Sequence, residues 1–186
     1  MPAVILDACG VLNLYASGQF VSILSLRTHE WYLPAAVEKE SKQYRQPDPA
    51  DAGKLIVLPI DLGPAINAGV LSRCDCEGDA ETELYVELAA RIQDDGESMG
   101  LAIAKWRGWS VLTDDKKARR IASELGVEVL STPGVMKLWA EIVNPGAREL
   151  SAVLEAIERF ANYRPGRVAE NYDWWIASIK ASANKN

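Results

Sequence analysis

Short apolar runs alternate along the chain with longer segments whose apolar residues recur at helical spacing. The apolar runs at residues 4–6, 31–33, 109–112 and 127–130 predict strands. The longer segments predict helices, which cover residues 11–15, 19–26, 34–44, 79–92, 96–106, 116–125, 133–143, 149–161 and 171–180. Strands and helices that alternate in this way predict an α/β fold, in which a central, mostly parallel sheet has helices on both faces in three layers, α/β/α.

Two regions interrupt this alternation. Residues 46–53 contain prolines, aspartates and a glycine, which predicts a loop, and residues 55–60 (LIVLPI) predict a buried strand or a hairpin arm. Pro145 and Gly146 end the helix at 133–143. We therefore predict one main domain over residues 1–145 and a C-terminal helical extension, residues 146–186, that packs on the same domain.

The composition fits one cytoplasmic domain. The chain has 186 residues, of which 48% are apolar, and its net charge of −6 argues against a protein that binds DNA or membranes by bulk positive charge. Its three cysteines and one histidine are too few for a disulfide framework or a zinc site with four such ligands. The N-terminal segment has no basic region before its short apolar run, so we expect neither a signal peptide nor a membrane span.

Acidic residues follow two of the predicted strands. Asp7 ends the first strand and Asp114 ends the strand at 109–112, and the carboxyl ends of parallel strands meet at one edge of the sheet. Glu97 lies in the first turn of the helix that leads into the second of these strands, and Glu40 lies about two turns into the helix that begins at Pro34. Asp7, Glu40, Glu97 and Asp114 are therefore expected to share one pocket.

Each of these acids also has an ordinary structural interpretation. Either Asp114 or Asp115 could cap the following helix, and we assign Asp114 to the site and Asp115 to the cap or to a supporting position. Glu97 could be only a favourable charge at the start of a helix, and Glu38 competes with Glu40 on the same charged stretch. Asp7 is the sharpest signal, because an acid between an apolar strand and an apolar helix has little apparent structural reason to be there.

Clustered carboxylates indicate a metal site. They repel one another unless a cation neutralises them, and their hard oxygen atoms suit Mg²⁺ or Mn²⁺. Such an ion can generate hydroxide from bound water and stabilise the charge that develops during phosphodiester hydrolysis. Two other classes fit poorly: a haloacid-dehalogenase phosphatase needs a second acid where this chain has Cys9, and a dinucleotide-binding enzyme needs a glycine-rich turn of which only Gly10 is present.

Three blocks of the sequence resemble the PIN-domain family of metal-dependent nucleases. They are VILDACGVLNLYASG, PAAVEKE and DDGESMGLAIAKWRGWSVLTDDKKARRIASELGVEVLSTPGVM, which together cover most of residues 4–136, and the closest resemblance in pattern is to prokaryotic toxin-type members. The resemblance implies a PIN-like nuclease domain over residues 1–145. It also implies the catalytic acids, in order along the chain: Asp7, Glu40 (with Glu38 as the alternative), Glu97 and Asp114. Among these, Asp7, Glu97 and Asp114 would hold Mg²⁺ or Mn²⁺.

Substrate contacts are expected beside the fourth acid. The resemblance places the Thr113 hydroxyl near the metal-bound water, and Lys116 and Arg119 open the next helix, where a scissile phosphate would lie. We therefore expect a divalent-metal-dependent endoribonuclease that acts on RNA, with a possible antitoxin protein and a second copy of the chain as partners and no membrane partner. The alternative is a catalytically idle PIN-like module that serves only in binding.

Overall fold

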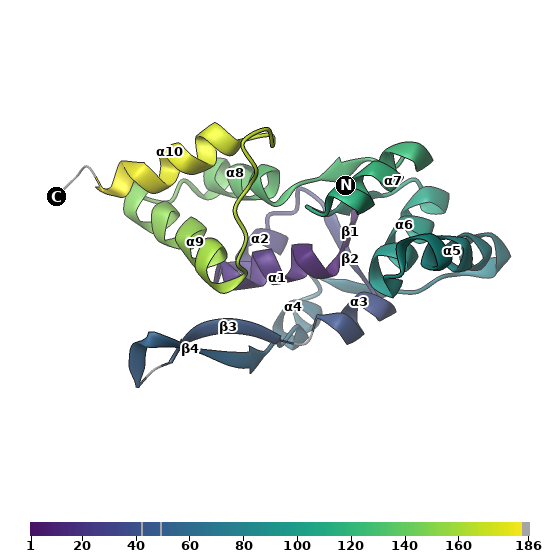
Figure 1. Ribbon diagram of the computed structural model, residues 1–186, viewed down its shortest axis with the longest axis horizontal. Coiled ribbons are helices and arrows are strands. Elements are labelled where there is room, and N and C mark those ends of the chain that lie inside the picture. Colours follow the sequence, from purple (N-terminus) through teal and green to yellow (C-terminus); the bar gives the residue numbers. More distant parts are fainter. Residues whose placement is uncertain (42, 49, 184–186) are drawn as a thin grey trace.

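The computed structural model describes residues 1–41, 43–48 and 50–183, and a five-stranded parallel sheet lies at its centre (Figure 1). The strand order is β5-β2-β1-β6-β7, with bounds Ser72–Cys74, Glu30–Pro34, Ala3–Leu6, Ser110–Leu112 and Val129–Leu130. The central pairing aligns Leu6 of β1 with Leu112 of β6. The predicted parallel sheet is thus confirmed, whereas β5 was not predicted because its three residues, Ser-Arg-Cys, carry no apolar run.

The helices cover both faces of this sheet. In chain order they are α1 (Ala8–Ala16), α2 (Phe20–Leu24), α3 (Ala35–Glu40), α4 (Gly63–Asn67), α5 (Gly78–Ile92), α6 (Asp95–Arg107), α7 (Lys116–Leu125), α8 (Thr132–Val143), α9 (Ala147–Phe160) and α10 (Tyr172–Ala183). Val4 and Leu6 of β1 belong to one apolar core, which α1, α2, α8, α9 and α10 complete. Ile5 belongs to the other core, with α5, α6 and α7, because successive side chains of a strand point to opposite faces.

A β-hairpin leaves the main body between α3 and α4. It consists of β3 (Gln43–Asp48) and β4 (Asp51–Pro59), which pair only with each other, and it projects beyond the helices (Figure 1). The predicted helix at 34–44 is therefore too long, since α3 ends at Glu40, and most of the predicted loop at 46–53 is strand. Of the residues in these two predictions, 42 and 49 lie outside those that the structure describes.

The apolar run in β4 forms a hairpin arm, as one of the two alternatives predicted, but it is not a buried strand. Val57 is 56% exposed. An apolar composition favours strand pairing, but a strand is buried only when other elements cover both of its faces. In this hairpin only one face packs toward the main body of the protein. Its Tyr44 lies against Tyr15 of α1, with ring centroids 4.8 Å apart.

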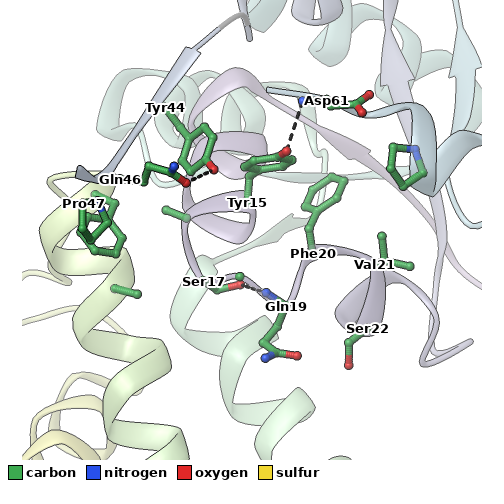
Figure 2. Close-up of a pocket in the computed structure, with 15 residues that line it drawn as sticks. Tyr15, Ser17, Gln19, Phe20, Val21, Ser22, Tyr44, Gln46, Pro47 and Asp61 are labelled. Carbon is green, nitrogen blue, oxygen red and sulfur yellow. Dashed lines mark hydrogen bonds between the residues drawn. The ribbon is translucent and has the colours of Figure 1, made fainter. Parts of the chain in front are cut away.

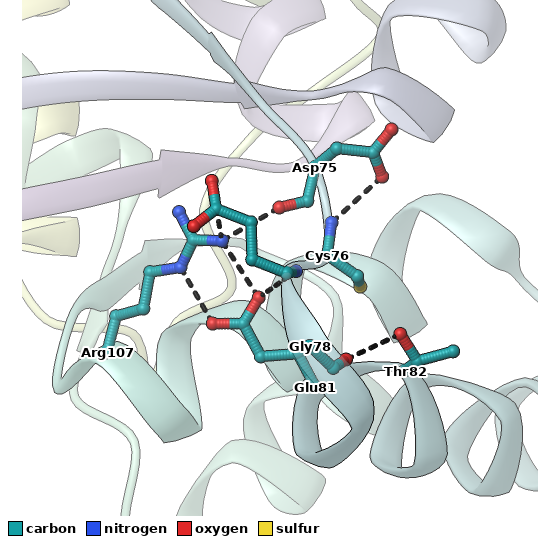
Figure 3. A network of polar contacts seen from close by, with 7 residues as sticks. Asp75, Cys76, Gly78, Glu81, Thr82 and Arg107 are labelled. Carbon is teal, nitrogen blue, oxygen red and sulfur yellow. Dashed lines mark hydrogen bonds and ion pairs between the residues drawn. The ribbon is translucent and has the colours of Figure 1, made fainter.

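An ion-pair network fixes the C-terminal end of α6 (Figure 3). Arg107 makes two hydrogen bonds of 2.8 Å to the Glu81 carboxylate of α5 and a third, also 2.8 Å, to the Asp75 carbonyl. The Arg107 guanidinium lies 5.0 Å from the centroid of the Trp109 ring, which stacks on Tyr32 of β2. The network joins α5, α6 and the sheet, and thereby sets the position of α6.

The C-terminal segments return to the sheet through α9 and α10. Helix α9 packs against α1, and α10 packs against α8 and α9, with Trp175 fully buried. The connection between α9 and α10 crosses in front of α1 (Figure 1). Among the residues that the structure describes, no helix has the length and apolar character needed to cross a membrane.

Candidate active site

Asp7 follows β1 directly and begins α1. Its Oδ1 atom accepts a hydrogen bond of 2.5 Å from the Gly10 amide, so its side chain caps the helix. Our view that Asp7 has little structural reason to be acidic is therefore wrong, because the first turn of α1 uses this side chain. Gly10 permits the close approach, since a Cβ atom there would lie 3.1 Å from Asp7 Oδ1 and from Leu112.

The second carboxylate oxygen of Asp7 has no hydrogen-bond partner. The residue is 3% exposed, and Oδ2 is a buried, unpaired acceptor. Burial, together with the charges of Asp114 and Asp115, raises the pKa of Asp7 to about 7 against the opposing effects of the Thr113 hydroxyl and the Gly10 amide. A buried oxygen of this kind is stable only with a proton or a cation beside it.

Glu97 reaches the same region from the start of α6. The Asp94 side chain caps this helix by accepting a 2.8 Å hydrogen bond from the Glu97 amide. Burial raises the pKa of Glu97 to about 7, with further contributions from Asp115, Asp94 and Asp7, and only Lys117 opposes them. The Asp7 charge contributes to the raised pKa of Glu97, which agrees with the expected approach of Glu97 to Asp7.

Asp115 is the third carboxylate of this group. Its Oδ1 atom accepts hydrogen bonds of 2.7 Å and 2.9 Å from the Lys117 and Ala118 amides, so Asp115 caps α7 as predicted. Its charge also raises the pKa of both Asp7 and Glu97. The residue that we expected only to cap a helix or support the site therefore lies among the acids.

Asp114 lies at the same edge of the sheet as Asp7, as predicted, but its carboxylate oxygens already accept hydrogen bonds from other parts of the chain. They accept hydrogen bonds from Asn13 Nδ2 at 3.2 Å, from the Thr132 amide at 3.2 Å and from the Tyr163 hydroxyl at 2.9 Å. Its charge raises the pKa of Asp7 but is absent from the charges that act on Glu97. Asp114 thus adjoins Asp7 while it binds α1, the start of α8 and the segment after α9.

Sequence reasoning missed these three donors. Asn13 carried a usable signal, because it is a buried polar residue in an otherwise apolar helix, and such a side chain needs a polar partner. Thr132 and Tyr163 offered no such pattern. Thr132 donates through its backbone amide, and Tyr163 lies in a segment without regular secondary structure.

The two candidates for the second acid have separate partners. Glu40 accepts a 3.1 Å hydrogen bond from the Gly96 amide at the start of α6, and burial together with Asp94 raises its pKa. Glu38 instead pairs with Arg73, at 2.6 Å and 2.8 Å. Glu40 is therefore the acid that contacts the helix bearing Glu97, but it is not among the groups that shift the pKa of Asp7 or Glu97.

Basic residues surround the start of α7. Lys116 is exposed, and Arg119 donates a 3.1 Å hydrogen bond from Nη1 to the Thr113 carbonyl. Lys117 donates to the Ile92 carbonyl at 2.7 Å and lowers the pKa of Glu97. Thr113 is fully buried, and its Oγ1 accepts a 3.2 Å hydrogen bond from the Asp115 amide.

The expected convergence of all four predicted acids is not found. Across the residues that the structure describes, no three His, Cys, Asp or Glu side chains are arranged so that they could hold a metal ion together. Asp114 accepts hydrogen bonds from the Thr132 amide and the Tyr163 hydroxyl, whereas Glu40 accepts one from the Gly96 amide of α6. The remaining group, Asp7, Glu97 and Asp115, fits a divalent cation by its chemistry, because it combines hard oxygen donors, mutual repulsion and the unpaired Asp7 oxygen.

Comparison with known proteins identifies the family of the chain. A family model described as a PIN domain matches residues 3–165, which run from β1 past the end of α9. No curated protein matches the chain. PIN domains are generally nucleases, and thus hydrolases, and they typically use divalent metals. Because the match spans most of the chain and the parallel sheet carries its acids at the carboxyl edge, this protein belongs to the PIN-domain family.

Proposed function

We propose that this protein is a divalent-metal-dependent endoribonuclease whose central acids are Asp7, Glu97 and Asp115. The observation that carries the proposal is the buried Asp7 Oδ2 atom, which has no hydrogen-bond partner and lies within the electrostatic reach of the other two carboxylates. Burial and the neighbouring negative charges raise the pKa of Asp7 and of Glu97 to about 7, so a cation that binds there would relieve an unfavourable accumulation of charge. Membership of a nuclease family adds independent support.

The unpaired Asp7 carboxylate oxygen would contact the cation, Mg²⁺ or Mn²⁺, and the nearby charges of Glu97 and Asp115 would attract it. When bound, such an ion lowers the pKa of water and offsets the negative charge that develops on a phosphodiester. Asp7 is fixed by the Gly10 amide and Asp115 by the first amides of α7, so their carboxylates are oriented before any ligand arrives. Preorganisation of this kind reduces the rearrangement needed at the reacting phosphate.

The neighbouring residues would position these acids and the substrate. Asp114 holds the loop between β6 and α7 through its bonds to Asn13, Thr132 and Tyr163, and we place it as a positioning residue. Glu40 has the same kind of role at the start of α6 through Gly96. Lys116 is exposed at the start of α7 and is free to contact a phosphate, whereas Arg119 is held near the edge by the Thr113 carbonyl.

RNA is the substrate that the charge distribution favours. The chain has a net charge of −6, which opposes the approach of a long duplex, so binding must depend on a few local cations. A single-stranded or structured RNA can bind such a local site while placing fewer phosphates near the acidic surface than a long duplex does. The antitoxin partner and the second copy of the chain remain predictions.

Cleavage of a mixed RNA pool tests the proposal. Parent protein should cut RNA in Mn²⁺ and stop in chelator, and Asp7→Asn and Asp115→Asn should each lower the rate at least about 100-fold, the scale of losing one electrostatic contact in a reaction. Asp115→Asn is the sharper variant, since Asn also caps helices well and only the charge is lost.

A matched control separates the site from the general acidity of the chain. Asp79→Asn removes one carboxylate from the exposed first turn of α5 and should leave cleavage unchanged. Equal cleavage by the parent and by Asp7→Asn would assign the activity to a contaminant. In that case the binding-module alternative would replace the nuclease.

A further inference from the structure

A hollow of about 490 Å³ lies at the end of α1 opposite to Asp7 (Figure 2). Its walls come from the last turn of α1, from α2, from β3 of the hairpin and from α9. Four aromatic residues line it: Tyr15, Phe20, Tyr44 and Phe160. The hollow therefore exists only because the hairpin and the C-terminal helix both approach α1.

The aromatic walls are held in place before any ligand binds. The Tyr15 and Tyr44 rings meet edge to face at 4.8 Å, and the Phe20 ring lies 5.7 Å from Tyr15. The Tyr44 hydroxyl donates to Gln46 Oε1 at 2.7 Å, and the Tyr15 hydroxyl accepts from the Asp61 amide at 3.2 Å. A preformed pocket of this type loses little side-chain entropy when a flat ring enters.

Polar groups with spare hydrogen-bonding capacity also face the hollow. The Gln46 amide nitrogen and the Gln19 side chain have no hydrogen-bond partner among the residues that the structure describes, and Figure 2 shows Gln19 and Tyr44 on opposite sides of the hollow. An amide supplies both donors and an acceptor. Flat apolar faces combined with a few amide groups match the surface of a nucleobase, which has π faces and a polar edge.

A second, smaller hollow adjoins this pocket. It measures about 320 Å³, shares Tyr44 and Phe160 with the first, and is also lined by Leu12 and Arg45. Leu12 lies on α1 between Asp7 and Tyr15. At a rise of about 1.5 Å per residue, these two residues are about 12 Å apart along the helix axis. This distance corresponds to about three or four stacked nucleotides at roughly 3.4 Å each.

The charges divide between the two hollows. Arg45 lines the smaller one and has no ion-pair or hydrogen-bond partner in the part of the chain that the structure describes. The described residues that line the aromatic hollow include no Lys or Arg and one carboxylate, Asp61. A phosphate therefore suits the hollow with Arg45, and an uncharged ring suits the aromatic one.

We propose that the aromatic hollow binds one unpaired nucleobase of the RNA, a few nucleotides from the scissile phosphate, while Arg45 contacts the intervening backbone. The inference rests on the proposed function, because it follows one RNA strand along α1 from the acidic group. It gives this chain a subsite that favours single-stranded over paired RNA, since a paired base cannot enter.

Binding of a single-stranded RNA hexamer that contains 2-aminopurine tests this subsite without cleavage, in chelator, by fluorescence titration. Ala156 of α9 lines the hollow, and Ala156→Trp should fill it and weaken binding about tenfold, the scale of one lost base stack. Ala152→Trp is the matched control, because residue 152 lies one turn away on the same helix, is exposed and does not line the hollow. This control should bind like the parent.

Two further variants guard against misfolding. Tyr44→Leu removes one aromatic wall of the hollow and should weaken hexamer binding about as much as Ala156→Trp does. Arg45→Ala should weaken binding and reduce its salt dependence. Lys54→Ala, on the same hairpin, is the control and should change neither. Thermal melting of each variant shows whether it is folded.

The outcomes separate the two proposals. In one outcome, the parent cleaves RNA while folded Ala156→Trp and Tyr44→Leu bind the hexamer as tightly as the parent does. That result would contradict the nucleobase subsite and leave the proposed nuclease activity intact. The hollow would then be assigned to a side chain of a protein partner. If the parent neither binds nor cleaves RNA, the proposed function fails, and the subsite fails with it.

Discussion

The Tyr163 hydroxyl donates a 2.9 Å hydrogen bond to the Asp114 carboxylate, although 49 residues separate them in the chain. Burial and the Asp114 charge both raise the pKa of Tyr163, so the phenol keeps its proton and remains a donor. The segment that follows α9 is thereby attached to the same edge of the sheet that carries Asp7 and Asp115.

Tyr163→Phe tests this attachment. It removes a half-buried hydrogen bond to a carboxylate, and such bonds contribute roughly 1.5–3 kcal/mol to stability. We expect Tm to fall by about 5 °C, measured by differential scanning calorimetry at pH 7.5. Tyr172→Phe, a control without such a bond among the described residues, should leave Tm unchanged. An unaltered Tm for Tyr163→Phe would show that the Asp114 contact does not stabilise the fold.

Asp7 predicts an unusual pH dependence of stability in metal-free buffer. Its pKa is raised to about 7 in the folded protein, so between about pH 4 and pH 7 the folded state binds a proton that the unfolded state has lost. The free energy of unfolding therefore falls as the pH rises through this window, and Glu97 acts in the same direction. We expect Asp7→Asn to melt about 5 °C above the parent at pH 8 and to lose most of this advantage at pH 5. A variant that melts below the parent at both pH values would contradict the prediction.

Divalent metal should reverse this destabilisation at pH 8. A ligand that binds only the folded state at a hundredfold excess over Kd adds about 2.7 kcal/mol to the free energy of unfolding. Mn²⁺ should therefore raise the Tm of the parent, and the increase should largely disappear in Asp115→Asn, because the helix cap stays while one carboxylate charge is lost. Asp79→Asn should retain the full increase. An equal response in all three proteins would place the metal elsewhere.

Gly96 and Glu40 should be strongly coupled. A Cβ atom at position 96 would overlap the Glu40 carboxylate, which accepts a hydrogen bond from the Gly96 amide. Gly96→Ala alone should displace the Glu40 carboxylate and lower stability by about 1 kcal/mol through loss of its hydrogen bond from the residue 96 amide, despite the better helix propensity of Ala. In a Glu40→Ala background the same change should be neutral or stabilising. A double-mutant cycle by urea denaturation measures the coupling, and additive effects would contradict the contact.

The Arg107–Glu81 pair should be essential for stability. The Arg107 and Glu81 side chains are 18% and 8% exposed, so Arg107→Met leaves a buried carboxylate with no cation beside it, held only by the Glu77 amide, at a cost of about 3 kcal/mol. Arg107 also lowers the pKa of Glu81, and the stability that this pairing gives is present above about pH 4.5 and lost as the pH falls below it. Urea denaturation at pH 7 measures the cost. Arg91→Met is the control, because its ion pairs are exposed.

The sequence determined the architecture of this protein. Four of the five parallel strands and nine of the ten described helices follow from the pattern of apolar residues. Strands covered on both faces need continuous apolar runs, whereas a helix packed on one face needs apolar residues with period 3.6. The position of Asp7 at the carboxyl edge also followed from sequence, since the residue directly after a parallel strand must lie there. The same argument placed Asp114 and Asp115 at that edge.

Only the tertiary structure decided which acids face one another. Asp114 and Asp115 are adjacent in the chain, but Asp114 accepts hydrogen bonds from α1, the start of α8 and the segment after α9, while Asp115 caps α7. The charges of both raise the pKa of Asp7, and that of Asp115 also raises the pKa of Glu97. The donors to Asp114 come from distant parts of the chain and leave no periodic signal. The position of the hairpin against α1 and the aromatic hollow were likewise beyond sequence reasoning. Both depend on how separate elements approach one another, whereas local patterns report only which face of each element is apolar.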